Sequence, residues 1–466
     1  EATIRDKGFQ AALIDWTSSV AKGEVNKRNV ATGWALYDAA AQAGDTKTAA
    51  DIMTRIVIHQ RNAAQAVQAT RILKRMSPSA QLYGIQRSVQ NMQEELTSKY
   101  GDKAPNLKVP DELIERYLNA ENQEQRDEAE VEIYKSIGKQ MPSTFRDKWN
   151  AWRYLAMLFN VRTHVRNVTG NALFAIPVAV KNVVGTVVEG GVSAVSGGKI
   201  KRTKGVATPE LVSAAWADFK KVEGQIMAAG KWDDSSAKKD IIQDSRTIFK
   251  SRVIEGFRKF NSGALQVEDS LACRPHYANA LAQYCAANGI SAEQIRAGDG
   301  IGSEAMDKAR GYAIKEARKA TFRDFNDFSD FISGMGRYSG KSPTKKAVAV
   351  LAEGLFPFRR TPANIMARAV EYSPINLANV VAELAYNGYL AHKGRTEDML
   401  PASQIIDNFA SGLTGTGLFA LGGYLVSQGL MVASGDDDEE QSKFDELLGR
   451  QKNSFEGKDG TNFTID

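Results

Sequence analysis

Histidine and cysteine are the side chains of this sequence that could most directly bind a metal ion or act as nucleophiles. The four histidines are far apart along the chain: His59, His164, His276 and His392. Cys273 lies three residues before His276, but these two side chains do not complete a zinc site, which takes four ligands. Cys285 follows twelve residues later, so the cysteines form neither a CxxC motif nor a disulfide framework. We therefore expect both to be small core residues of a chain made in a reducing compartment.

Carboxylates gather in one short stretch, DFNDFSD, which starts at Asp324. An EF-hand calcium loop needs a glycine at its sixth position and a glutamate at its twelfth, and this stretch has neither. Phenylalanines recur at every third residue, with aspartates between them: Phe322, Phe325, Phe328 and Phe331 with Asp324, Asp327 and Asp330. The pattern predicts a helix whose phenylalanines are buried and whose carboxylates face water.

Motifs for phosphate binding and for nucleophilic catalysis are absent from the sequence. It contains no GxxxxGK[ST] loop and no GxSxG pattern. The segment GDGIGSEAMDKARG contains GxG, but the residues before it do not have the pattern of the strand that a nucleotide-binding loop follows. We therefore expect a protein that is not an enzyme and that uses no metal, cofactor or small-molecule substrate.

The composition is that of a folded helical protein. Of the 466 residues 43% are hydrophobic and 25% are charged, and the net charge of +5 is too small to argue for nucleic acid. Only 12 prolines are present, and helical spacing dominates over strand-like alternation. We predict an all-α, multi-helix fold. Its expected segments are a helical-hairpin scaffold (1–95), a charged linker and helix (96–142), an aromatic helix with an apolar glycine-rich segment (143–205), an amphipathic helical domain (206–345), C-terminal helices with an uncharged glycine-rich segment (346–435) and an acidic, polar tail (436–466).

Three helical features are specific enough to test. Apolar residues flank the turn AGDT as in a helical hairpin: Trp34, Leu36, Tyr37 and Ala40 before it, and Ile52, Ile56 and Ile58 after it. Asp45 or Thr46 would cap the second helix of this hairpin by accepting its free amide hydrogens. The charged stretch from about Pro110 predicts one helix that is mostly solvated. The stretch from RVIEGF to CAANG predicts one long helix.

An uncharged segment from Phe409 to Ser434 is the most distinctive part of the sequence. Its 26 residues would span about 39 Å as a helix, against a bilayer core of about 30 Å. Its six glycines favour close helix contact but lower helix propensity in water by about 1 kcal/mol each. These are Gly412, Gly415, Gly417, Gly422, Gly423 and Gly429. Two interpretations stay open, a membrane element in which charge at Leu421 would prevent insertion, and the buried centre of a soluble domain.

A second apolar segment covers residues 167–198 and is closed by the basic stretch KIKRTK. It is rich in small and β-branched residues and is interrupted only by Lys181 and Glu189. Neither apolar segment can be left in water without exposing a large apolar patch. We therefore expect the two segments to pack on each other, within one chain or between copies.

Three phrases of the sequence are similar to segments of a known group of proteins. WNAWRYLAMLFNVRTHVRNVTGN, FPFRRTPANIMARAVEYSP and GLTGTGLFALGGYLVSQGLM resemble segments of the large polyvalent proteins of bacteriophages and integrative elements. Related segments occur in the internal virion (ejection) proteins of short-tailed phages. The resemblance covers about two thirds of the chain, from Phe145 to Ser434, and carries no catalytic motif.

The resemblance implies a non-enzymatic protein that is made in the bacterial cytoplasm and packaged with the phage genome. Such a protein would enter the host with the DNA, form oligomers with itself and other virion proteins, and contact membrane lipid in the cell envelope. The alternative is a soluble helical scaffold of a phage or mobile element that binds DNA or proteins. Basic residues would then contact phosphates: Lys199, Lys201, Arg202, Lys204, Lys345, Lys346, Arg359 and Arg360.

Overall fold

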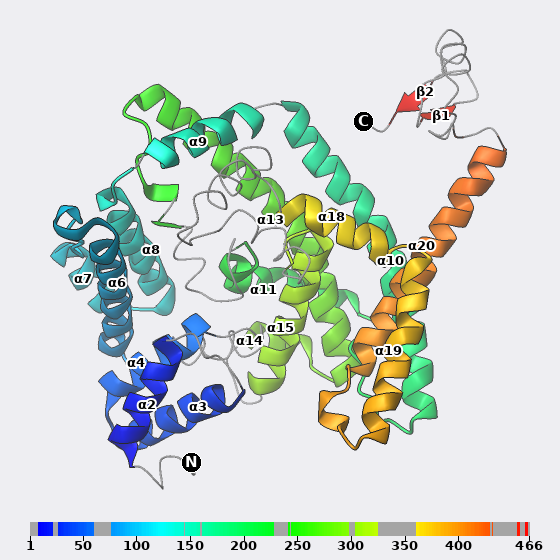
Figure 1. Ribbon diagram of the computed structural model, residues 1–466, viewed down its shortest axis with the longest axis horizontal. Coiled ribbons are helices and arrows are strands. Elements are labelled where there is room, and N and C mark those ends of the chain that lie inside the picture. The colour runs from blue at the N-terminus through cyan, green and yellow to red at the C-terminus, as the bar shows by residue number, and fades with distance from the viewer. Residues whose placement is uncertain are drawn as a thin grey trace, which may run out of the picture. The chain divides into compact units, whose positions relative to one another are not determined.

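The computed structural model of the chain is a helical protein, as predicted (Figure 1). It describes residues 8–21, 27–59, 76–143, 145–158, 161–227, 241–242, 244–297, 303–324, 360–428, 431, 454–456 and 462–464. The chain divides into two compact units. Unit 1 comprises Glu1–Asn167 and Ala207–Asp324, and unit 2 comprises Val168–Val206 and Phe325–Asp466.

The first helices of unit 1 confirm the predicted hairpin. α2 (Phe9–Ala21), α3 (Lys27–Gln42) and α4 (Thr46–His59) share a core that contains Trp16, Leu36 and Ile52. Asp45 precedes α4 and accepts hydrogen bonds from the Thr48 amide at 3.1 Å and the Thr48 hydroxyl at 2.6 Å. These hydrogen bonds hold the pKa of the Asp45 carboxyl below its usual value. Asp45 is therefore the cap that the sequence indicated.

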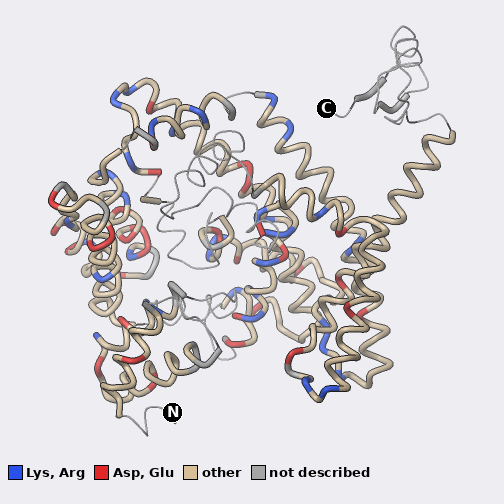
Figure 2. The backbone as a smooth tube through the Cα atoms, in the orientation of Figure 1, with Lys and Arg blue, Asp and Glu red and all other residues tan. Residues whose placement is uncertain are grey.

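The charged region forms two helices rather than the one expected. After α6 (Pro78–Tyr100) and η1 (Gly101–Lys103), the chain forms α7 (Asp111–Leu118) and α8 (Gln123–Gln140). Asn122 caps α8 by accepting a hydrogen bond from the Gln125 amide, which explains the break. Figure 2 shows charged residues along these helices. Their apolar residues form a core with α6, so this core extends across the expected boundary at residue 95: Leu82, Ile85, Val89, Tyr117, Ile133 and Ile137.

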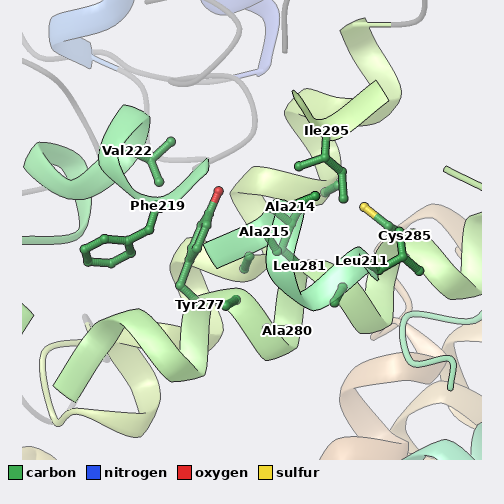
Figure 3. Packing of buried hydrophobic residues seen from close by; sticks show 14 of the residues in the cluster. Leu211, Ala214, Ala215, Phe219, Val222, Tyr277, Ala280, Leu281, Cys285 and Ile295 are labelled. Carbon is green, nitrogen blue, oxygen red and sulfur yellow. The ribbon is translucent and has the colours of Figure 1, made fainter. Parts of the chain in front are cut away.

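The largest core of unit 1 joins four helices (Figure 3). They are α11 (Pro209–Met227), α13 (Arg252–Asn288), α14 (Ala292–Ala297) and α15 (Ser303–Ala320). The long helix expected from RVIEGF to CAANG is α13, which ends at Gly289 in the left-handed conformation. A buried network crosses this core, in which Asp218 receives hydrogen bonds from Tyr277 at 2.8 Å and from Arg310 at 2.6 and 3.0 Å. The remaining helix of unit 1 is α9 (Phe145–Leu158).

Both cysteines lie in the interior of unit 1, as predicted. Cys273 and Cys285 are fully buried free thiols. Burial raises the pKa of both thiols, that of Cys285 to about 12. They therefore act as small apolar residues, because the reactive thiolate is disfavoured.

Unit 2 contains the two apolar segments. It is formed by most of α10 (Val161–Val195) and by α18 (Arg360–Glu371), α19 (Ile375–His392), η2 (Thr396–Asp398) and α20 (Ala402–Ser427). Figure 1 shows α19 and α20 as an antiparallel hairpin. Two short antiparallel strands, β1 (Ser454–Glu456) and β2 (Asn462–Thr464), pair near the C-terminus, with Phe455 opposite Phe463.

Several predicted features lie outside the described residues. These are Phe325, Phe328, Phe331, Asp327, Asp330, Lys345, Lys346, Arg359 and Gly429. The described start of that series differs from the prediction: Phe322 lies in a turn after α15 with a φ of 57°, and Asp324 is buried rather than facing water. The acidic block at 436–440 also lies outside the described residues.

Candidate membrane interface

Two helices of unit 2 are long and apolar enough to cross a membrane, by length and composition. They are α10, from Arg162 to Val195, and α20, from Ala402 to Ser427. The buried core helix of a soluble protein can meet the same criteria. Only 17% of the most apolar part of α10 and 28% of that of α20 is buried inside the chain, however. Neither helix is the centre of a core within this chain.

α10 has a polar buried face and an apolar exposed face. Its buried residues include Lys181, Asn182 and Glu189. The exposed large apolar residues lie mostly three or four positions apart along the opposite side: Val165, Val168, Leu173, Ile176, Val180, Val183, Val187 and Val195. A surface helix of a soluble protein has the reverse pattern, with apolar residues inside and charges in water. α10 is therefore inverted with respect to such a helix.

The other helices of unit 2 share this inversion. Large apolar side chains are exposed on α18, α19 and α20: Ile365, Met366, Val370, Ile375, Val381, Leu384, Tyr386, Tyr389, Leu413, Leu418, Phe419, Leu421, Tyr424 and Val426. Charged and amide side chains are buried on the same helices: Asn364, Arg368, Glu371, Asn376, Asn387 and Asp407. The C-terminal half of α20 is uncharged throughout its length (Figure 2).

The exposed surface of these helices carries no charged side chain over long stretches. Across residues 168–198, 361–391 and 399–428, each charged residue is buried except Glu383, which is half-buried. These five buried residues and Lys204 of the adjoining loop balance in charge: Lys181, Lys204 and Arg368 against Glu189, Glu371 and Asp407. Charged residues within a bilayer face the bundle interior and pair with one another. Unit 2 has this arrangement.

Asp407 is the centre of the buried ionic cluster. Its carboxylate lies 3.0 Å from the Lys181 ammonium and 2.6 Å from that of Lys204. Both lysine side chains are 2% exposed. The cluster therefore ties α20 to α10 and to the loop that follows α10.

That loop is held against α10 by a second carboxylate. Glu189 accepts hydrogen bonds from the Thr203 amide at 2.8 Å, the Thr203 hydroxyl at 2.6 Å and the Lys204 amide at 2.8 Å. The Lys204 side chain then passes over Gly185, where an added Cβ would lie 3.2 Å from its Cδ. Glu189 and Gly185 thus direct Lys204 towards Asp407.

Polar contacts also join α18, α19 and α20. Arg368 pairs with Glu371, and Glu371 accepts a hydrogen bond from the Ser411 hydroxyl at 3.0 Å. The Asn376 amide donates to the Asn408 carbonyl at 2.8 Å. Side-chain hydrogen bonds between helices are typical of membrane bundles, where apolar contact alone gives no preference for protein over lipid.

The glycines of α20 fall into two groups. An added Cβ at Gly412 would lie 3.0 Å from Leu377, and one at Gly415 would lie 2.1 Å from the Tyr372 backbone. Added Cβ atoms at Gly417, Gly422 and Gly423 would meet nothing within 4 Å. The close glycine contacts are therefore made with the first turn of α19 and with the α18–α19 connection. The prediction that Phe409–Ser434 packs on the segment after Asn167 is not confirmed, because α20 packs mainly on α19 and α18. α20 meets Lys181 of α10 through Asp407, which lies outside the predicted segment.

Replacing Gly415 with leucine should separate α20 from the α18–α19 connection, because the new side chain would overlap the Tyr372 backbone. Overpacking of this kind costs about 1–3 kcal/mol. Hydrogen exchange followed by mass spectrometry should show faster exchange in α19 and α20 but unchanged exchange in α11 and α13. Gly422→Leu is the matched control and should not accelerate exchange, because its side chain meets no neighbour and leucine favours the helix more than glycine does. Equal behaviour of the two variants would contradict the packing described here.

The described basic residues that were proposed as phosphate contacts differ in their exposure. Lys199 and Lys201 are exposed, and the half-buried Arg202 donates to the Lys204 carbonyl at 3.1 Å. Lys204 differs from the expectation, because its ammonium is buried on Asp407 rather than open to a phosphate. Arg360 starts α18, and its side chain is outside the described set.

The ionic cluster itself was not predicted from the sequence. The available indication was that Lys181 and Glu189 are isolated charges within one apolar segment. Asp407 lies just before the other apolar segment, Phe409–Ser434. Isolated charges of this kind are functional or pairing residues when the segment enters a membrane. Among the described residues, no group of three or more histidine, cysteine or carboxylate side chains could hold a metal ion.

Comparison of the chain with protein-family models, with curated proteins and with solved structures found no match.

Proposed function

We propose that this chain is a non-enzymatic internal virion (ejection) protein of a bacteriophage whose unit 2 enters the host membrane during DNA delivery. The observation that carries the membrane part is the inversion of unit 2, with charges inside and an uncharged apolar surface outside. In water this surface would be a large exposed apolar patch, and such patches mark interaction sites. A bilayer would cover this apolar surface on all four helices, α10, α18, α19 and α20, together.

The delivery part of the proposal rests on the resemblance of residues 145–434 to phage proteins. It places the protein in the virion interior and then in the host cell envelope, after synthesis in the bacterial cytoplasm. Its partners are further copies of itself, other virion proteins and membrane lipid. Unit 1, which has three apolar cores of its own, is the part that stays in water. It also exposes apolar side chains along α13: Val253, Phe257, Phe260, Val267 and Leu271.

Flotation of the full chain with phosphatidylcholine vesicles tests the membrane part. We expect the protein to float with the vesicles and to stay with them after an alkaline carbonate wash. Protease should then cleave unit 1 while α19 and α20 remain protected. A protein that stays at the bottom of the gradient as a folded species would contradict membrane entry.

The location in the virion is tested separately, on purified particles of the phage that encodes the chain. Mass spectrometry should detect the protein in intact particles and lose it from particles that have released their DNA. Detection only in infected cytoplasm would favour the alternative, a soluble scaffold of a phage or mobile element. That alternative depends on the basic residues for DNA binding, and the burial of Lys204 removes one of them.

A further inference from the structure

Two connections of unit 2 lie at the same end of its helices. After α10 the chain turns at Gly197 and Gly198, whose φ angles are 62° and 78°, and folds back until Lys204 reaches Asp407 in the second turn of α20. The connection before α20 is held to α19 by Asn387, which bonds the Leu400 amide at 2.8 Å and its carbonyl at 2.9 Å. Both connections therefore lie where α10 ends and α20 begins.

This end of unit 2 is basic, and we call its exposed cations the basic end: Lys199, Lys201, Lys393 and Arg395. Arg395 is paired with the exposed Asp398 at 2.9 Å. The same connection also contains Glu397, so the four cations exceed the two carboxylates by two charges. Across residues 168–198, 376–391 and 399–428, on the helices next to it, the charged residues are buried except the half-buried Glu383. The boundary between basic and apolar surface is thus sharp.

Tyrosines mark the same boundary on α19. Tyr386 and Tyr389 lie in the last two turns of the helix and are both at least half exposed. The Lys393 ammonium lies 5.9 Å from the centre of the Tyr389 ring. Tyrosine and tryptophan are enriched at the level of lipid headgroups, where lysine also reaches the water from an apolar helix.

We infer that the basic end binds the anionic headgroups of a phospholipid bilayer and so fixes which end of unit 2 lies at the membrane surface. This inference rests on the proposed membrane entry of unit 2. Exposed lysines act as point charges without a shaped pocket, which suits attraction to a negative surface rather than to one lipid species. The directly adjoining apolar helices favour lipid over DNA, because a DNA duplex would leave those helices in water.

Vesicle flotation with the full chain tests the inference. The variant K199Q/K201Q/K393Q removes three charges, and K135Q/K139Q/K220Q removes three exposed lysines of unit 1 as the matched control. Each lysine near an anionic surface contributes about fivefold at low salt, so the first variant should bind vesicles containing phosphatidylglycerol about 100-fold more weakly. The control should bind them like the wild type. High salt should reduce the difference between the two variants.

Phosphatidylcholine vesicles separate this inference from the proposed function. The wild type and both variants should float with them equally, because apolar insertion does not need the lysines. Failure of the wild type to float there would count against membrane entry itself. Unchanged binding of the lysine variant to anionic vesicles would overturn the inference alone. So would a loss of affinity for double-stranded DNA without a loss for anionic vesicles, since the basic end would then be a nucleic-acid site.

Discussion

Replacing Asp407 with alanine is expected to destabilise unit 2 by about 3–5 kcal/mol, because removing one partner of a buried ion pair leaves uncompensated charge. Both the Lys181 and the Lys204 ammonium would lose the carboxylate while remaining buried. Hydrogen exchange of the full chain in detergent micelles should show opening of α10 and α20. The four-helix core of unit 1 should keep its protection.

Two controls separate this effect from a general loss of a surface charge. Asp398→Ala breaks the exposed pair with Arg395, and exposed pairs contribute at most about 1 kcal/mol, so it should change little. The triple variant K181M/K204M/D407V replaces the three charged side chains with apolar ones and should recover most of the lost protection. If Asp407→Ala behaved like Asp398→Ala, the ionic cluster would not be what holds α20 to α10.

Local patterns in the sequence were sufficient to predict the helical class and several details. The hairpin around Asp45, the long helix α13 and the two buried cysteines follow from helical periodicity, capping and composition, which act over a few residues. The break between α7 and α8 could have been found from the cap at Asn122. The C-terminal strand pair was missed, although glycines and an Asp-Gly step lie between its two halves.

The candidate site could be predicted only in part because its contacts are distant in sequence. The apolar character of α10 and α20 is visible residue by residue, and so are the length and composition that a membrane-spanning helix needs. The pairing of Lys204 with Asp407 joins residues 203 positions apart, and one sequence does not indicate which lysine meets which carboxylate. Lys204 was therefore predicted to be one of several exposed basic residues. In the structure the loop after α10 folds back onto Glu189, which places the Lys204 side chain inside unit 2.

Placing arginine on the exposed apolar face of unit 2 should prevent stable membrane insertion. Val183 on α10 is 65% exposed and Leu421 on α20 is 51% exposed, so arginine fits at either site without overlap inside the chain. A charge at the centre of a membrane helix costs about 2.5–3.5 kcal/mol, which is about a 100-fold loss of partitioning into phosphatidylcholine vesicles for each variant. On a water-exposed surface the same change alters stability by no more than about 0.5 kcal/mol.

The matched control is Val267→Arg, at a 60% exposed valine of α13 in unit 1. It should float with vesicles like the wild type, because unit 1 is expected to remain in water. Circular dichroism before lipid is added should show all three variants equally helical. A loss of partitioning into vesicles then comes from the cost of placing arginine in the bilayer and not from misfolding. Should Val183→Arg and Leu421→Arg float as well as Val267→Arg, the uncharged faces of α10 and α20 do not contact lipid. A protein partner or a second copy would then have to cover them, since apolar side chains on inverted helices with buried charges are not suited to water.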